Sequence, residues 1–156
     1  MIKYKQLYKH APEDGQYGDC HRTALAAILN VPQESVPNFG EHYDCHENFV
    51  AAETEWLHSQ GLASFTAPYS AKTTTLSQLL WSLKHHAPNI PVVVIVATER
   101  GLAHSIIACN GKIVLDPYTG EEEPNIEKYA GVDDEVTGDT YFWVQILVPA
   151  SIKYYG

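Results

Sequence analysis

The stretch AHSIIACNGKIVLDP, residues 103–117, decides the fold because it encodes two strands that must run antiparallel. Its two β-rich halves flank Asn110-Gly111, a dipeptide typical of the two-residue turn of a β-hairpin. In a tight hairpin, the first residues of one strand lie beside the last residues of the other. The pattern therefore brings His104 and Asp116, which stand near the two open ends, into the same neighbourhood.

The register of this hairpin decides whether the two side chains meet. A regular hairpin with this turn pairs Cys109 with Lys112, and the register then sets His104 opposite position 117, one position from Asp116. A β-bulge or a slip of one residue would let the carboxylate reach the imidazole, where it would fix the orientation and tautomer of the ring. The alternative is that Asp116 is a simple turn residue, since Asp-Pro is common in turns.

Helical patterns precede the hairpin, and further strands lie on both sides of it. Apolar residues at helical spacing predict three helices, and short β-rich runs predict the strands. Helices followed by mostly antiparallel strands predict an α+β fold. An acidic, glycine-rich connection, residues 119–139, is expected to be an exposed loop. The predicted helices are 20–29, 45–61 and 75–88, and the predicted strands outside the hairpin are 62–68, 91–98 and 140–149.

Size and composition fit one globular domain, residues 1–156. Of the 156 residues, 45% are hydrophobic and 19% are charged, which is ordinary for a folded domain. The formal net charge of −9 argues against nucleic acids and anionic membranes as partners, because both are bound through clusters of Lys and Arg. No apolar run approaches the roughly 20 residues of a membrane span, and residues 1–15 lack the apolar segment of a signal peptide. We therefore expect a cytoplasmic protein.

A cysteine stands where the first helix is expected to begin. Cys20 precedes the run of small and apolar residues that predicts this helix, and Asp19 is a candidate N-cap. A thiol attacks carbonyl carbons as the thiolate, and both a helix N-terminus and a nearby imidazole lower its pKa. His104, held by Asp116, would supply that imidazole. A free cysteine is otherwise most often a small buried apolar residue, so the prediction of a nucleophile depends on His104.

The chain resembles the papain-like cysteine peptidases in four features that follow one another: Gly18-Asp19-Cys20 at the start of a helix, a strand with His104, the Asn110-Gly111 turn and Asp116-Pro117. Within that superfamily, the chain is similar to the double-glycine leader peptidases of bacterial peptide exporters, which carry Cys, His and Asp-Pro in the same order. A nearer resemblance is to a group of small, mostly uncharacterised proteins of bacterial viruses and bacteria, whose five ordered motifs are repeated in this chain. The likeness spans about residues 15–149. The motifs are Gly18-Asp19-Cys20, Val36-Pro37-Asn38-Phe39, Trp56-Leu57 with Gly61-Leu62, Arg100-Gly101-Leu102-Ala103-His104, and Asn110 to Pro117.

The resemblance implies a papain-like fold, in which N-terminal helices that carry the nucleophile pack on an antiparallel sheet. It implies a cysteine hydrolase, a peptidase or an isopeptidase or amidase, that acts on a peptide or protein through a thioester and needs no cofactor. Cys20 would be the nucleophile, His104 the general base and acid, and Asp116 the residue that orients His104. A viral origin would place the protein in the cytoplasm of a bacterial host.

The resemblance also implies a glutamine upstream of the cysteine that donates a hydrogen bond to the oxyanion. The upstream glutamines are Gln6 and Gln16, of which Gln16 stands four positions before Cys20, closer than the usual spacing of the family. The side chain of Asp19 is a further candidate for this place. The backbone N–H of Cys20, at the start of a helix, is a donor that depends on no side chain.

Three other functions fit the same sequence. The triad would also serve an acyltransferase or a transglutaminase-like enzyme, in which an amine takes the place of water. The fold could instead be kept for its surface, as a catalytically silent module that binds and inhibits a host protein. His42, Cys45 and His46 could ligate zinc in a small adaptor, but their spacing is irregular for a structural zinc site, and no metal is predicted.

Overall fold

The computed structural model describes residues 1–42 and 46–151, apart from the side chain of His42. An antiparallel sheet forms its centre. The strands follow the order β1-β6-β2-β3-β4, and β5 pairs with β6 on one side of this path. The six strands are β1 (Leu62–Ser70), β2 (Val92–Ala97), β3 (Ala103–Cys109), β4 (Lys112–Leu115), β5 (Val132–Asp133) and β6 (Thr140–Pro149).

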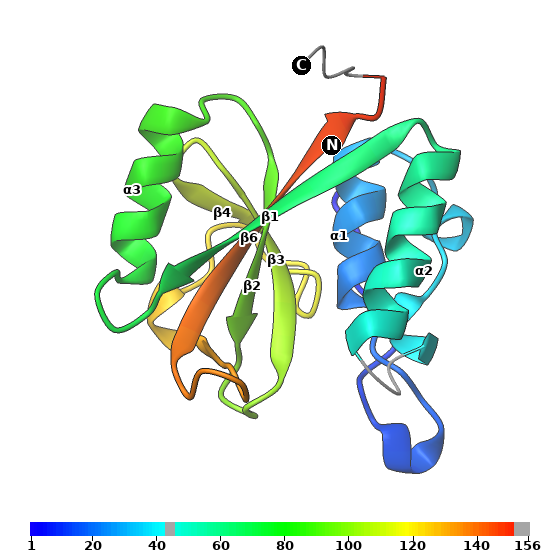
Figure 1. Cartoon of the computed structure of the whole chain (residues 1–156), viewed down its shortest axis with the longest axis horizontal. Helices are drawn as coiled ribbons and strands as arrows, with labels where there is room; N and C mark the ends of the chain where they lie inside the picture. The colour runs from blue at the N-terminus through cyan, green and yellow to red at the C-terminus, as the bar shows by residue number, and fades with distance from the viewer. Residues whose placement is uncertain (43–45, 152–156) are drawn as a thin grey trace.

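Helices cover both faces of the sheet (Figure 1). α1 (Cys20–Leu29) and α2 (His46–Ser59) lie on one side, and α3 (Leu76–His86) lies on the other. The α+β class predicted from the sequence is confirmed, and the strands of the predicted hairpin form within one residue of their expected bounds. Both faces of β2 are covered, which explains why this strand is an uninterrupted apolar run instead of an alternating one.

Two apolar cores, one on each face, hold the helices to the sheet. On one face, the leucines of α3 pack with Val94 of β2 and Ile106 of β3. On the other face, α1 packs with Val93 of β2 and Ile107 of β3. Three of the six buried residues of α1 are alanines, so the helix backbone lies close to the sheet. This close packing sets the N-terminus of α1 beside the start of β3.

Of the two irregularities that would bring Asp116 to His104, a β-bulge is the one present in the β3–β4 hairpin. The register runs as expected from the turn to the pair Ala108–Ile113, but the next pair is Ile107–Leu115. Val114 is therefore an extra residue on β4, as a bulge requires. Its effect is visible in the packing, because Ile113 belongs to the α3 side of the sheet and Leu115 to the α1 side.

The bulge decides on which face of the hairpin Asp116 emerges. In an unbroken register Asp116 would fall opposite Ser105, and its side chain would leave the sheet on the face away from His104. The shifted register, continued by one residue, sets it opposite Ile106, two positions from His104 and on the same side. A shift of one residue exchanges the two faces of a strand, so Val114 is what allows Asp116 and His104 to meet.

The connection 119–139 is only partly the exposed loop that its composition predicted. It contains a 3₁₀ helix, Ile126–Lys128, and the short strand β5. Ala130 pairs with Ala97 at the end of β2 through two backbone hydrogen bonds of 2.7 and 2.9 Å. This pairing folds the connection back across the sheet and buries Tyr129. The acidic composition of the segment predicted an exposed loop, so its pairing with the end of β2 was not expected from the sequence.

Within the described residues, no helix has both the length and the apolar character needed to cross a membrane.

Candidate active site

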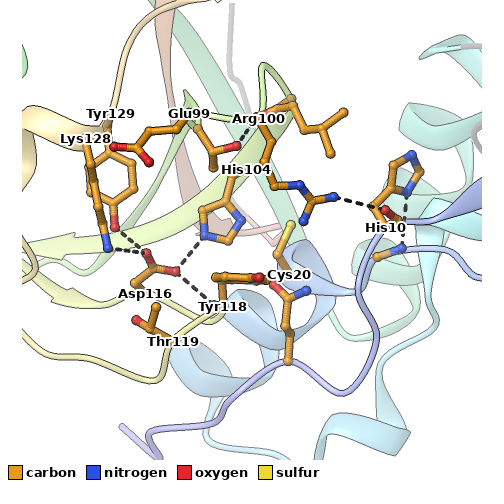
Figure 2. Close-up of a pocket in the computed structure, with 15 residues that line it drawn as sticks. His10, Cys20, Glu99, Arg100, His104, Asp116, Tyr118, Thr119, Lys128 and Tyr129 are labelled. Atoms are coloured by element: carbon orange, nitrogen blue, oxygen red, sulfur yellow. Dashed lines mark hydrogen bonds and ion pairs between the residues drawn. The ribbon is translucent and has the colours of Figure 1, made fainter.

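Cys20, His104 and Asp116 meet at one pocket (Figure 2). Cys20 is the first residue of α1, His104 is the second residue of β3, and Asp116 follows β4. His104 Nε2 lies 2.7 Å from Asp116 Oδ1. The other ring nitrogen, Nδ1, is left for the Cys20 side chain, which hydrogen-bonds to His104. The three residues that the sequence predicted to act together line the same cavity, which has a volume of about 240 Å³.

Asp116 is buried, and both of its carboxylate oxygens have hydrogen-bond donors. Oδ1 accepts from His104 and, at 2.9 Å, from the backbone N–H of Tyr118. Oδ2 accepts from the hydroxyl of Tyr129 and lies 3.6 Å from the Lys128 ammonium. Burial raises the pKa of Asp116, but the contact with His104 and the hydrogen bonds from Tyr129 and Tyr118 outweigh it and lower the pKa overall. Asp116 therefore stays ionised and fixed in orientation.

The charge of Asp116 favours the protonated form of His104. Burial lowers the pKa of this imidazole, but the hydrogen bonds to Asp116 and Cys20, together with their charges, raise it to about 9. Burial raises the pKa of the Cys20 thiol, whereas His104, the backbone N–H of Ser105 and the charge of His21 lower it, and the net pKa is below its ordinary value. At neutral pH these directions favour a thiolate beside an imidazolium.

The N-terminus of α1 is left open next to the sulfur. Asp19 occupies the N-cap position, but its side chain makes no capping hydrogen bond. Its buried carboxylate instead accepts from the backbone N–H of Tyr8 at 2.9 Å and pairs with Arg22 at 3.1 Å. Within the part of the chain that the structure describes, the N–H of Cys20 has no hydrogen-bond acceptor. A free N–H at a helix N-terminus is suited to an anionic oxygen.

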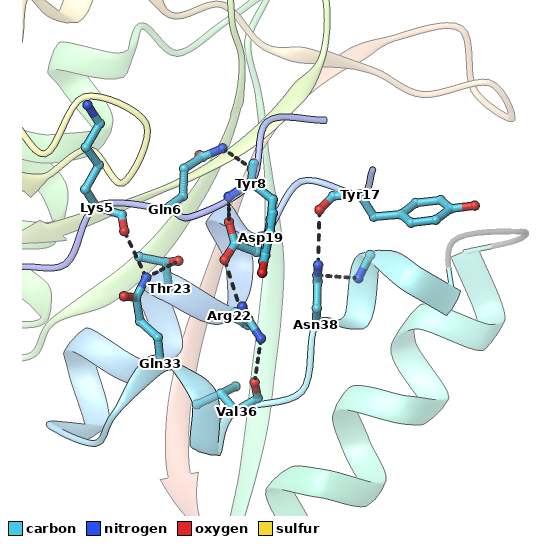
Figure 3. Close-up of polar contacts among 11 residues, drawn as sticks. Lys5, Gln6, Tyr8, Tyr17, Asp19, Arg22, Thr23, Gln33, Val36 and Asn38 are labelled. Atoms are coloured by element: carbon cyan, nitrogen blue, oxygen red, sulfur yellow. Dashed lines mark hydrogen bonds and ion pairs between the residues drawn. The ribbon is translucent and has the colours of Figure 1, made fainter. Parts of the chain in front are cut away.

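The N-terminal segment is strapped across α1 by buried polar contacts (Figure 3). Gln33 donates to the carbonyl of Lys5 at 2.9 Å and to the hydroxyl of Thr23 at 3.0 Å. The backbone N–H of Gln6 donates to the carbonyl of Pro117 at 2.7 Å, directly after Asp116. These contacts fix residues 5–8 at the edge of the pocket.

The two side chains that the sequence offered as oxyanion donors, Gln16 and Asp19, are not placed to donate to an oxyanion at Cys20. Gln16 is exposed, its amide donates to the carbonyl of Lys9 at 2.7 Å, and it does not line the pocket. The carboxylate of Asp19 is engaged by Tyr8 and Arg22, and an ionised carboxylate has no proton to donate. Gln6, the other upstream glutamine, does line the pocket with Cys20. Its Nε2 donates to the carbonyl of Tyr8 at 2.7 Å, and its buried Oε1 has no partner among the described residues.

A second histidine–carboxylate pair lies behind Cys20. His21 Nδ1 is 2.9 Å from the hydroxyl of Ser105, and His21 Nε2 is 3.1 Å from Glu53 Oε1. Gln145 donates to the same oxygen of Glu53. All four side chains are buried, so this network is closed to a substrate. It joins α1, α2, β3 and β6 directly beneath the site.

The charges of this buried pair support each other. Burial lowers the pKa of His21, but the charge and hydrogen bond of Glu53 raise it above its ordinary value, with a smaller contribution from Cys20. Burial raises the pKa of Glu53, and the contacts with His21 and Gln145 lower it below its ordinary value. The ionised Glu53 therefore favours the protonated form of His21, and this imidazolium lies next to Cys20 while the pair as a whole is neutral.

Several residues of the site were not identified from the sequence. Tyr118 and Tyr129 hold Asp116, while His21 and Glu53 brace the helix that carries Cys20. His21 is adjacent to Cys20 and could have been singled out on that ground. The others reach the site through tertiary contacts that no local pattern announces.

The zinc hypothesis cannot be placed on this structure, because Cys45 is outside the described residues and so is the His42 side chain. Among the described residues, no group of three or more His, Cys, Asp or Glu side chains is arranged to hold a metal ion.

Comparison of the chain with protein-family models, with curated proteins and with solved structures finds no match.

The raised pKa of His104 predicts how stability depends on pH. Because the pKa in the folded chain, about 9, is above the ordinary value of 6.5, the stabilisation from the ionised ring is complete below pH 6.5 and is lost as the pH rises through 9. Replacing Asp116 by Asn lowers this pKa toward 6.5, so the loss of stability with rising pH becomes smaller and is complete at lower pH. Urea unfolding of both proteins between about pH 6 and 10 measures the difference. Identical pH profiles would contradict the assigned His104–Asp116 pairing.

The buried His21–Glu53 pair predicts a large cost for removing one partner. Glu53→Ala leaves His21 and Gln145 buried without their acceptor, and we expect unfolding to become easier by about 3–5 kcal/mol. Glu55→Ala, at an exposed position on the same helix, is the matched control and should change stability by less than about 0.5 kcal/mol. Equal unfolding midpoints of the two variants would show that the pair contributes little.

Proposed function

We propose that the protein is a papain-like cysteine hydrolase that cleaves a peptide, isopeptide or related amide bond through a thioester intermediate. The observation that carries this proposal is the meeting of Cys20, His104 and Asp116 at a pocket, with the thiol at an uncapped helix N-terminus. A cytoplasmic location and a peptide or protein substrate, both predicted from the sequence, belong to the same proposal.

The arrangement of elements supports the papain-like assignment. The thiol begins a helix that packs on an antiparallel sheet, the imidazole stands on β3, and the carboxylate directly follows the neighbouring strand β4. The order along the chain, Cys20, His104 and then Asp116, is the one implied by the resemblance of the sequence motifs. The carboxylate holds Nε2 of the histidine, which leaves Nδ1 for the sulfur.

The proposed reaction begins when the Cys20 thiolate attacks the carbonyl carbon of the scissile bond. A carbon–sulfur bond forms, and the carbonyl oxygen becomes an oxyanion that accepts from the backbone N–H of Cys20. His104 gives its proton to the leaving nitrogen as the carbon–nitrogen bond breaks, and a thioester and a free amine result. The neutral ring then takes a proton from water, whose hydroxide attacks the thioester and releases the carboxylic acid and the thiolate.

Gln6 is the side chain that we assign to the oxyanion in place of Gln16. It lines the pocket with Cys20, and its backbone is tied to the turn that follows Asp116. The amide needs only to exchange its hydrogen bond to the Tyr8 carbonyl for one to the oxyanion. Gln6 stands fourteen residues before Cys20 in the sequence, but it reaches the pocket because the N-terminal segment is held across α1.

Replacing Cys20 by Ala tests the proposed function. With p-nitrophenyl acetate as a generic acyl donor, the wild-type protein should release a burst of nitrophenol and gain an acetyl group on Cys20, detected by intact mass and peptide mapping. Cys20→Ala should lose both signals, and Cys109→Ala, at the far end of β3, should keep them. Acetylation spread equally over other residues, or turnover that survives Cys20→Ala, would refute the assignment.

A second assay, with peptides as the substrate, separates hydrolysis from the rival functions. With a peptide mixture as substrate, hydrolysis yields new carboxyl termini, whereas an acyltransferase yields amide products when an amine is added. A silent binding module would show neither acylation of Cys20 nor cleavage.

The assignment of Gln6 predicts a split between two rates. Gln6→Ala should lower the rate of acetylation of Cys20 by about 100-fold, because one oxyanion donor is lost. Its rate of alkylation by iodoacetamide should change little, since alkylation forms no oxyanion. Gln16→Ala is the matched control and should leave both rates unchanged. A parallel loss of both rates in Gln6→Ala would indicate a structural role instead.

A further inference from the structure

Two positively charged side chains meet at Tyr118, on the rim of the pocket of a protein that is acidic overall. The chain has 19 acidic and 10 basic residues, yet Arg100 and Lys9 both converge on the hydroxyl of Tyr118 beside Cys20. The Lys9 ammonium lies 5.6 Å from the centre of the Tyr118 ring. Arg100 also donates to the carbonyl of His10 at 3.3 Å, which holds its guanidinium over the cavity (Figure 2).

No carboxylate neutralises these two cations among the described residues. Three exposed lysines elsewhere on the molecule, Lys3, Lys72 and Lys112, each pair with an acidic side chain, whereas Lys9 and Arg100 take part in no such pair. Glu99 also lines the pocket, but its side chain points away from Arg100, toward Lys128 and Tyr129 (Figure 2). The positive charge is therefore free to meet an anion from outside.

Tyr118 fixes this charge relative to the reacting groups. Its backbone N–H donates to Asp116, and its ring stands edge-on to His104 with 6.4 Å between the ring centres. The pKa of its hydroxyl is lowered, mainly by the hydrogen bond from Lys9. The charge of Lys9 and the contact with Arg100 lower it further. The fork of an arginine and the point charge of a lysine together suit a carboxylate.

We propose that Lys9, Arg100 and the Tyr118 hydroxyl form an anion-binding subsite beside Cys20, which selects substrates that carry a carboxylate next to the scissile bond. The inference rests on the proposed function and names its substrate class. The carboxylate belongs either to an acidic side chain or to the free C-terminus of a peptide.

Two alkylating reagents of similar size and different charge test the subsite. Iodoacetate and iodoacetamide both form a sulfur–carbon bond with the Cys20 thiolate and release iodide, but only iodoacetate carries a carboxylate. The ratio of their rate constants removes differences in thiol reactivity. We expect this ratio to fall about threefold in Arg100→Gln and by a similar factor in Lys9→Gln, as partly exposed charge pairs allow. High salt should reduce the ratio in the wild-type protein.

Lys84→Gln is the matched control, because it removes one positive charge from an exposed position on α3, on the other side of the sheet. Its ratio should equal that of the wild-type protein. If Arg100→Gln and Lys9→Gln also keep the wild-type ratio, the subsite is refuted while the proposed function stands. If neither reagent modifies Cys20 faster than Cys109 in the wild-type protein, the proposed function itself fails.

Protection of Cys20 from iodoacetamide identifies the source of the carboxylate. One mixture of short peptides contains glutamate and an amidated C-terminus, a second contains glutamine and a free C-terminus, and a third contains glutamine and an amidated C-terminus. Stronger protection by the first mixture indicates an acidic side chain, and stronger protection by the second indicates a terminal carboxylate. If neither protects better than the third, neutral mixture, the proposed substrate class is wrong.

Discussion

The contact between Asp116 and His104 is the interaction on which the site depends. The carboxylate is buried, and a buried charge without partners would be strongly unfavourable. Its oxygens instead accept hydrogen bonds from His104, Tyr118 and Tyr129, and the Lys128 ammonium lies nearby. The same contacts fix the plane of the imidazole and select the nitrogen that faces Cys20. Without the carboxylate, the ring would lose both its orientation and the charge that keeps it protonated.

Local signals predicted those parts of the site that local structure determines. Asn110-Gly111 specified the turn, and the hairpin followed with His104 and Asp116 at its open end. The extra residue, Val114, could be anticipated only as a possible bulge, because an apolar residue there is compatible with either register. Tyr129 and Gln6 could not be assigned, since the first arrives through the pairing of Ala130 with Ala97 and the second through the strap across α1. Both depend on tertiary contacts between segments that are distant in the sequence.

Two neighbouring pairs of residues build two polar networks from the same two elements. Cys20 and His104 face the pocket, whereas the next residue of each element, His21 and Ser105, turns into the protein. The inner network continues to Glu53 and is closed to solvent, so its geometry is set by packing. Because it joins α1 directly to β3, it fixes the distance between the backbone atoms that carry the outer pair. A site that opens onto a pocket thus obtains its rigidity from a second histidine contact, which is closed to solvent.

The overall and local charges of the molecule have different consequences. A net charge of −9 gives an acidic surface that disfavours extended polyanions such as nucleic acid, which must be neutralised along their length. Charges farther apart than about 8–10 Å are largely screened at physiological salt, so this repulsion is weak for a single carboxylate that has already reached the pocket. Arg100 and the protonated His104 line the pocket, and Lys9 adjoins it at Tyr118. An acidic protein can therefore present a site that attracts a small anion, provided that the cations at its rim are not paired with carboxylates of the chain itself.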